Sequence, residues 1–110
     1  MNRQDTHKIA VVGLGYVGLP LAVHFAKEFD VIGFDLDSEK INKYINGKDP
    51  TEEVGEDAIK ASRMLFTDNP KKLREANFII IAVPTPINLD KSPNLEPLLK
   101  ASRLVGENMQ

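Results

Sequence analysis

The chain has 110 residues, 42% of them hydrophobic and 27% charged, which is ordinary for a soluble globular protein and allows one domain at most. Its net charge of -2 gives no support to binding of nucleic acid or of an anionic membrane, and no apolar run approaches the roughly 20 residues that span a bilayer. Cysteine is absent, so disulfides, thiolate metal sites and a cysteine nucleophile are excluded within these residues, and a cytoplasmic location is expected.

The first half of the chain predicts two strands, each followed by a helix. A continuous apolar run over residues 8–12 is typical of a parallel strand covered on both faces, and a helical pattern follows over residues 16–28. A second strand is predicted over residues 30–34. The next helix is predicted over residues 38–45, with Ser38 as its N-cap.

The second half continues this alternation. The predicted elements are a helix over 51–62, a short strand over 64–67, a short helix over 70–75 capped by Asn69, a strand over 77–83, a polar loop over 87–93, and a helix over 95–108 with Leu98, Leu99, Ser102, Val105 and Met109 along one side. Alternating strands and helices predict an α/β protein with a Rossmann-type doubly wound parallel sheet. A full sheet of this type has two halves, so a partial one of about four strands is expected, with helices on both faces.

A glycine-rich turn joins the first strand to the first helix, with the sequence Gly13-Leu14-Gly15-Tyr16-Val17-Gly18. Strand, glycines, helix, second strand and a closing acid in this order form the fingerprint of a dinucleotide-binding fold. In that fingerprint Gly13 permits the tight turn, Gly15 lets a pyrophosphate approach the backbone, and Gly18 lets the helix pack closely. The N–H groups that begin the helix would bind the phosphates. A glycine-rich turn without a ligand is the alternative.

The closing acid is Asp35, twenty-two residues after Gly13. Its carboxylate is expected to accept hydrogen bonds from ribose hydroxyls and to repel a 2′-phosphate, so NAD is favoured over NADP. Lys40 could lie near the adenosine and offset that repulsion, although a solvated helix lysine is the plainer interpretation. Asp37 is expected in the cap of the next helix. Residues 1–110 are therefore expected to be the N-terminal part of a NAD-binding Rossmann domain, from a longer enzyme whose substrate domain is absent.

The fourth strand is followed by Val83-Pro84-Thr85-Pro86. In the strand order 3-2-1-4 this strand lies beside the first, and ligands bind outside the carboxyl ends of those two strands. Thr85 is therefore expected beside the glycine turn, where its hydroxyl or N–H could meet the cofactor. A turn that only ends the strand is the alternative. His7 and His24 are isolated, and no metal site is expected.

Three stretches, KIAVVGLGYVGLPLAVHFAK, VIGFDLDSEKI and NFIIIAVPTPI, resemble the UDP-glucose/GDP-mannose dehydrogenase family. The resemblance covers residues 7–109 and corresponds to the start of the family's N-terminal NAD-binding domain. Gly-Tyr-Val-Gly-Leu-Pro is far more specific than the glycine spacing alone. The run PTPINLDKSPNLEPLLKAS is most similar to the branch of UDP-N-acetylhexosamine (glucosamine or galactosamine) 6-dehydrogenases.

The resemblance implies an oxidoreductase that converts the C6 alcohol of a UDP-N-acetylhexosamine to a carboxylate with two NAD, for surface polysaccharide biosynthesis. A homo-oligomer is implied for the full-length enzyme. In the family a cysteine nucleophile captures the aldehyde, and it lies in segments beyond Gln110, so no catalytic residue is expected in this chain. The family's cofactor-binding roles fall on Gly13, Leu14, Gly15, Tyr16, Val17, Gly18, Asp35, Lys40, Val83 and Thr85.

Two other functions fit parts of the pattern. Another two-domain NAD dehydrogenase, such as a hydroxyacyl-CoA or phosphogluconate type, would share the fingerprint, but the Gly-Tyr-Val-Gly-Leu-Pro and Val-Pro-Thr-Pro motifs together argue against it. A non-catalytic Rossmann nucleotide-sensing module would need no substrate domain.

Overall fold

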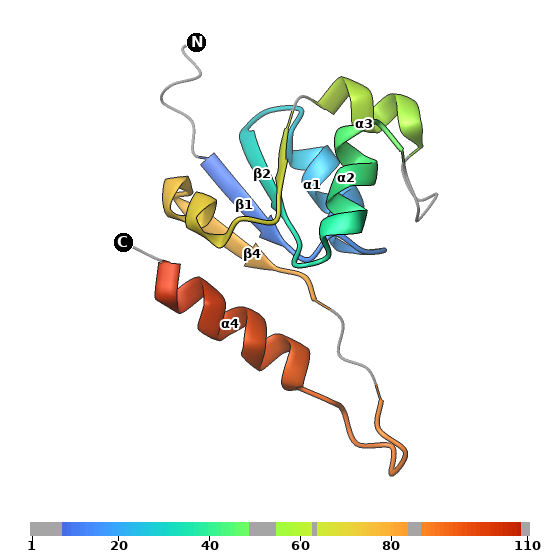
Figure 1. Cartoon of the computed structure of the whole chain (residues 1–110), viewed down its shortest axis with the longest axis vertical. Helices are drawn as coiled ribbons and strands as arrows, with labels where there is room; N and C mark the ends of the chain where they lie inside the picture. Colours follow the sequence, from blue (N-terminus) through green and yellow to red (C-terminus); the bar gives the residue numbers. More distant parts are fainter. Residues whose placement is uncertain (1–7, 49–54, 63, 84–86, 109–110) are drawn as a thin grey trace.

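The chain forms one parallel sheet from four described strands: β1 (Lys8–Val12), β2 (Asp30–Phe34), β3 (Leu65–Thr67) and β4 (Phe78–Ile81). The computed structural model describes residues 8–48, 55–62, 64–83 and 87–108. The strand order is β3-β2-β1-β4, which confirms the predicted order (Figure 1). Val12 at the end of β1 pairs with Phe34 of β2 and with Ile81 of β4. The carboxyl ends of these three strands therefore lie along one edge of the sheet.

Helices cover both faces of the sheet (Figure 1). They are α1 (Gly18–Phe25), α2 (Ser38–Ile45), α3 (Glu56–Ser62), the 3-10 helix η2 (Pro70–Glu75) and α4 (Glu96–Asn108). One core lies between the sheet and α1, α2 and α3, and a second core lies between the sheet and η2 and α4. In the part of the chain that the structure describes, no helix has the length and apolar character needed to cross a membrane.

The apolar run of β1 is continuous because successive side chains enter different cores. Ile9 and Val11 belong to the core under α1, whereas Ala10 and Val12 belong to the core under α4. Side chains of a strand alternate between its two faces, so a strand covered on both sides needs apolar residues at every position. The prediction of a doubly covered central strand over residues 8–12 is confirmed.

The bounds of β1, β2, α2 and η2 are as predicted, and so is the Asn69 cap of η2, while the other elements are shorter. The first helix begins at Gly18 rather than residue 16 and ends at Phe25 rather than residue 28. Its end tightens because Lys27 and Glu28 donate to carbonyls three residues back instead of four. The β3 strand starts one residue later than predicted, and the β4 strand covers only residues 78–81 of the predicted 77–83. Of the predicted helix over 51–62, residues 51–54 lie outside the described part.

The prediction that Asp37 lies in the cap of α2 is confirmed, whereas the prediction of Ser38 as its N-cap is wrong. Asp37, not Ser38, precedes the helix in extended conformation, and its carboxylate accepts hydrogen bonds from the amides of Glu39 and Lys40. The Ser38 hydroxyl instead donates to the carboxylate of Asp68. Both residue types cap helices well, so the residue types alone do not decide between the two positions.

The stripe predicted along α4 was also partly wrong. Leu99 is 61% exposed and Ser102 is exposed, while the buried residues of this helix are Ala101, Val105 and Asn108. Met109 lies outside the described residues. The helix is therefore rotated relative to the predicted face, and Val105 is the one residue of the predicted stripe that lies fully in the core.

Candidate functional site

A cleft of about 760 Å³ opens at the carboxyl edge of the sheet. Its walls are the turn after β1, the end of β2 with Lys40, the residues after β4 and one side of α4. The lining comprises residues 12–17, 34–36, 82–83, Lys40, Pro97, Lys100, Ala101 and Leu104. The turn, the acid and the residues after β4 that sequence analysis singled out are thus brought to one place.

Two of the glycines in the turn are required by the fold itself. Gly13 has a φ of +100°, and a Cβ on it would lie 3.0 Å from the carbonyl group of Ala82. A Cβ on Gly18 would lie 1.6 Å from the carbonyl oxygen of Gly13, which no side chain can satisfy. Gly13 thus makes the tight turn and Gly18 allows the close helix packing that the fingerprint predicts.

Gly15 differs, because nothing in the described protein requires a glycine at this position. A Cβ built on Gly15 meets no atom within 4 Å, and the residue is not among the glycines with positive φ. Gly15 lines the cleft, so the space that its missing side chain leaves is open to a ligand. A site that must admit a group close to the backbone would produce this pattern.

The start of α1 offers backbone donors to the cleft. Among the described residues, the amides of Gly15, Tyr16, Val17 and Gly18 donate to no protein acceptor, whereas the amides of Leu19 and Leu21 make helical hydrogen bonds. Unpaired amides at the first turn of a helix attract anions, because they combine hydrogen-bond donors with the positive end of the helix dipole. Tyr16 and Val17 are each 70% exposed. The turn is suited to bind a phosphate-bearing ligand.

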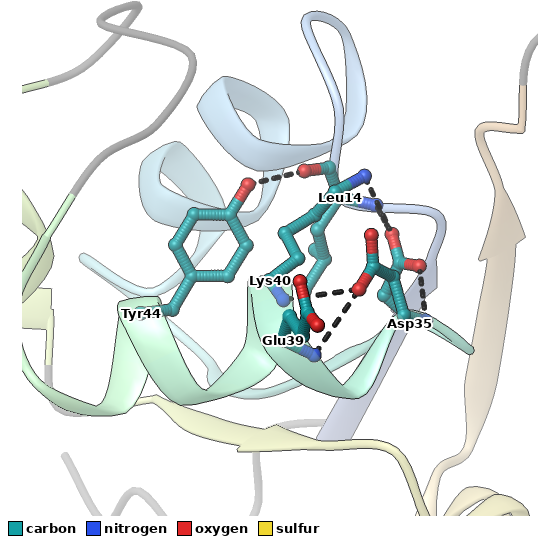
Figure 2. Close-up of polar contacts among 6 residues, drawn as sticks. Leu14, Asp35, Glu39, Lys40 and Tyr44 are labelled. Atoms are coloured by element: carbon teal, nitrogen blue, oxygen red, sulfur yellow. Dashed lines mark hydrogen bonds and ion pairs between the residues drawn. The ribbon is translucent and has the colours of Figure 1, made fainter.

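Leu14 fixes this turn to the rest of the domain by three contacts, of which Figure 2 shows the two hydrogen bonds. Its side chain is fully buried and packs closely on Gly33 of β2. A Cβ built on Gly33 would lie only 3.1 Å from Cδ1 of Leu14. Its amide donates to Oδ2 of Asp35 at 2.9 Å, and its carbonyl oxygen accepts a hydrogen bond from the Tyr44 hydroxyl at 2.5 Å. Because Asp35 already binds the Leu14 amide, the donors open to a ligand are those of residues 15–18.

Asp35 lies between the turn and α2 (Figure 2). Its Oδ1 accepts the amide of Asp37 at 3.0 Å, and its Oδ2 forms an ion pair with Nζ of Lys40 at 3.4 Å. The side chains of Asp35 and Lys40 are 14% and 29% exposed, and both line the cleft. The carboxylate is therefore oriented by backbone and charge partners while it still faces the cavity.

The fourth strand and α4 complete the walls. The amide of Ala82 donates to the carbonyl of Val12 at 2.7 Å, which holds Val83 beside the glycine turn in the cleft. Thr85, which sequence analysis places at the same edge, lies outside the described residues. Lys100 and Leu104 of α4 were not predicted to line the cleft. The four α4 residues that line the cleft have the spacing i, i+3, i+4, i+7, which places them on one face of a helix. This spacing is the signal in the sequence that could have indicated them.

Comparison with known proteins agrees with this geometry. The model for the UDP-glucose/GDP-mannose dehydrogenase family, NAD binding domain, matches residues 7–110. The chain is 52% identical over 103 residues to UDP-N-acetyl-D-glucosamine 6-dehydrogenase of Salmonella typhi, and this match covers 93% of the chain and 24% of the relative. It is 51% identical over 107 residues to Protein CapL of Staphylococcus aureus, with 97% and 24% covered.

A solved structure agrees as well. The UDP-D-ManNAc dehydrogenase of Pyrococcus horikoshii superposes with a TM-score of 0.85 at 38% identity, over 93% of the chain and 26% of that structure. The chain spans about a quarter of the length of the curated relatives it matches.

Proposed function

The chain belongs to the UDP-glucose/GDP-mannose dehydrogenase family, in which it matches the NAD-binding domain, and from this we propose that the cleft at the sheet edge holds NAD. One observation carries the proposal. The open space at Gly15, the unpaired amides of residues 15–17 and the oriented carboxylate of Asp35 all lie at the same cavity, and the unpaired amide of Gly18 is the next one along the chain. The turn suits the diphosphate of a dinucleotide and the acid suits its ribose.

We assign the binding roles as follows. The amides of residues 15–18 donate to the diphosphate, Asp35 accepts from the adenosine ribose hydroxyls, and Lys40 lies near the same ribose. Gly13 and Gly18 shape the turn, Leu14 anchors it, and Val83 lines the opposite wall. Thr85 is included on the family resemblance. The carboxylate of Asp35 at the position of the ribose disfavours a 2′-phosphate and so favours NAD over NADP, although its ion pair with Lys40 offsets part of that repulsion.

NAD, when bound, supplies the hydride acceptor for an oxidation. The residues of this chain bind it and orient it. No catalytic residue is assigned here, and the 110 residues contain no cysteine.

For the protein as a whole we propose oxidation of the C6 alcohol of a UDP-N-acetylhexosamine to the carboxylate, with two NAD per sugar. Two relatives named UDP-N-acetyl-D-glucosamine 6-dehydrogenase support this substrate class. The one from Salmonella typhi is 52% identical to the chain, and the one from Pseudomonas aeruginosa is 50% identical. A role in surface polysaccharide biosynthesis, a homo-oligomeric enzyme and a cytoplasmic location belong to the same proposal.

The test is NADH formation by the protein at its full encoded length, measured against a panel of UDP-sugars. We expect the highest kcat/KM with a UDP-N-acetylhexosamine and two NADH formed for each sugar consumed. NAD binding without NADH formation from any UDP-sugar would instead support the nucleotide-sensing alternative. Highest activity with a hydroxyacyl-CoA would support the other class of dehydrogenase.

A further inference from the structure

We propose that Tyr44 is a positioning residue for the dinucleotide site, which acts through the peptide between Leu14 and Gly15. The proposal rests on the proposed function, because it assumes that the glycine turn binds a diphosphate. Tyr44 lies in α2, thirty residues from Leu14, and it does not line the cleft. Its hydroxyl donates to the Leu14 carbonyl from a side chain that is 1% exposed (Figure 2).

The direction of the peptide is the first step. The C=O of Leu14 and the N–H of Gly15 belong to one planar trans peptide, so they point in opposite directions. Because the carbonyl is directed at Tyr44 in the core, the Gly15 amide is turned away from the core. Gly15 lines the cleft, and its amide has no acceptor among the described residues. By binding the Leu14 carbonyl, the hydroxyl of Tyr44 thus orients the Gly15 amide toward the cleft, where the ligand would bind.

The Leu14 carbonyl also bears on the amide of Gly18. In a helix that began one turn earlier, the amide of Gly18 would donate to the carbonyl four residues back, which is that of Leu14. In this structure the carbonyl of Leu14 accepts from Tyr44 instead, and the amide of Gly18 has no acceptor within the described part of the chain. The Leu14 carbonyl is thus directed at Tyr44 and not along the axis of α1, and the amide of Gly18 is one of the unpaired amides at the start of that helix.

The second step is why such a contact is needed. Glycine adopts positive and negative φ with similar ease, so the peptide before Gly15 could rotate at little cost if nothing held it. The ring of Tyr44 is itself fixed, because it packs against Phe66 of β3 with a centroid distance of 5.2 Å. With Asp35 on the Leu14 amide and Tyr44 on the Leu14 carbonyl, the residue before Gly15 is held at both backbone groups.

Tyr44→Phe tests the proposal, because it keeps the ring and removes only the hydroxyl. Binding of ADP-ribose and of adenosine is measured by calorimetry on the protein at its full encoded length. We expect the variant to bind ADP-ribose about 3- to 10-fold more weakly, from the loss of one oriented hydrogen bond, and to bind adenosine as the unmodified protein does. Ser62→Ala is the matched control, since its hydroxyl also donates to a backbone carbonyl, that of Ile59 at 2.7 Å, but far from the turn.

Each outcome decides the matter. A loss for ADP-ribose alone, absent in Ser62→Ala, supports the positioning role. Equal losses of affinity for ADP-ribose and adenosine would overturn it, since Tyr44 would then support the domain as a whole. Unchanged affinity for both ligands would also overturn it, since the hydroxyl would then have no effect at the site. If the unmodified protein does not bind ADP-ribose, the proposed function itself fails, and this result is separate from any effect of the substitution.

Discussion

At the scale of single residues, three glycines in one turn are present for different reasons. Gly18 leaves no room for a Cβ, and Gly13 combines a positive φ with a tight approach to the Ala82 backbone, so both serve the fold. Gly15 has open space on its Cα and a φ that any residue can adopt, so the protein itself does not require it. The sequence motif treats all three alike, and only the packing around each one separates a structural glycine from a ligand-facing glycine.

Alanine substitutions should separate these roles. Gly15→Ala is expected to change the free energy of unfolding by less than about 1 kcal/mol and to weaken NAD binding by about 1–3 kcal/mol, because the new methyl group enters the space for the diphosphate. Gly18→Ala is expected to cost at least about 2 kcal/mol of stability, because its Cβ meets the Gly13 carbonyl. Urea unfolding and calorimetry measure both. Equal stability losses in the two variants would contradict the assignment.

A second prediction at the scale of single residues concerns the carboxylate of Asp35. Asp35→Ala should weaken NAD binding by about 1–3 kcal/mol, since the ribose hydroxyls lose an acceptor and the Leu14 amide loses its partner. The same variant leaves Lys40 without the carboxylate it pairs with, so NADP should lose less affinity than NAD. Calorimetric titration with both dinucleotides gives the comparison. Unchanged NAD affinity would remove Asp35 from the site.

At the scale of elements, the strand and helix order could be predicted from periodicity and turn residues, and so could the edge of the sheet where the site lies. The bounds of β1, β2 and α2 follow from local patterns. Contacts between residues far apart in the sequence could not be predicted in this way. Nothing near Tyr44 in the sequence indicates that its hydroxyl binds the Leu14 carbonyl, because that contact depends on how α2 docks on the sheet. The rotation of α4 likewise depends on the path of the chain that leads to it.

The cap of α2 gives an element-scale prediction. Asp37→Ala should lower the free energy of unfolding by about 1 kcal/mol, because its carboxylate accepts two amides of the first turn. Ser38→Ala is the matched control and should cost clearly less, since its hydroxyl binds the exposed Asp68 rather than the helix backbone. Urea unfolding of both variants measures the difference. A larger loss for Ser38→Ala would contradict the assignment of Asp37 as the N-cap and favour Ser38.

At the scale of the whole molecule, large apolar side chains lie at the surface of the four-stranded fold. Phe78 on β4 is 53% exposed, Leu99 on α4 is 61% exposed, and Ile87 is 67% exposed. The chain also spans about a quarter of the length of its curated relatives. A small fold with such exposed apolar surface gains less stability from burial than a larger, fully covered one.

The 110 residues expressed alone should therefore be marginally stable or should self-associate. Thermal unfolding followed by circular dichroism is expected to give a broad transition or one at low temperature, and light scattering is expected to detect association at rising concentration. A sharp transition of a monomer at high temperature would contradict this expectation.

The most direct test of the account is a crystal structure of the full-length protein with NAD. We expect diphosphate oxygens within hydrogen-bond distance, about 2.7–3.2 Å, of the amides of residues 15–18, and a carboxylate oxygen of Asp35 at the same distance from the adenosine ribose. A dinucleotide whose diphosphate lies away from that turn, or whose ribose does not reach Asp35, would contradict the assignment of this cleft.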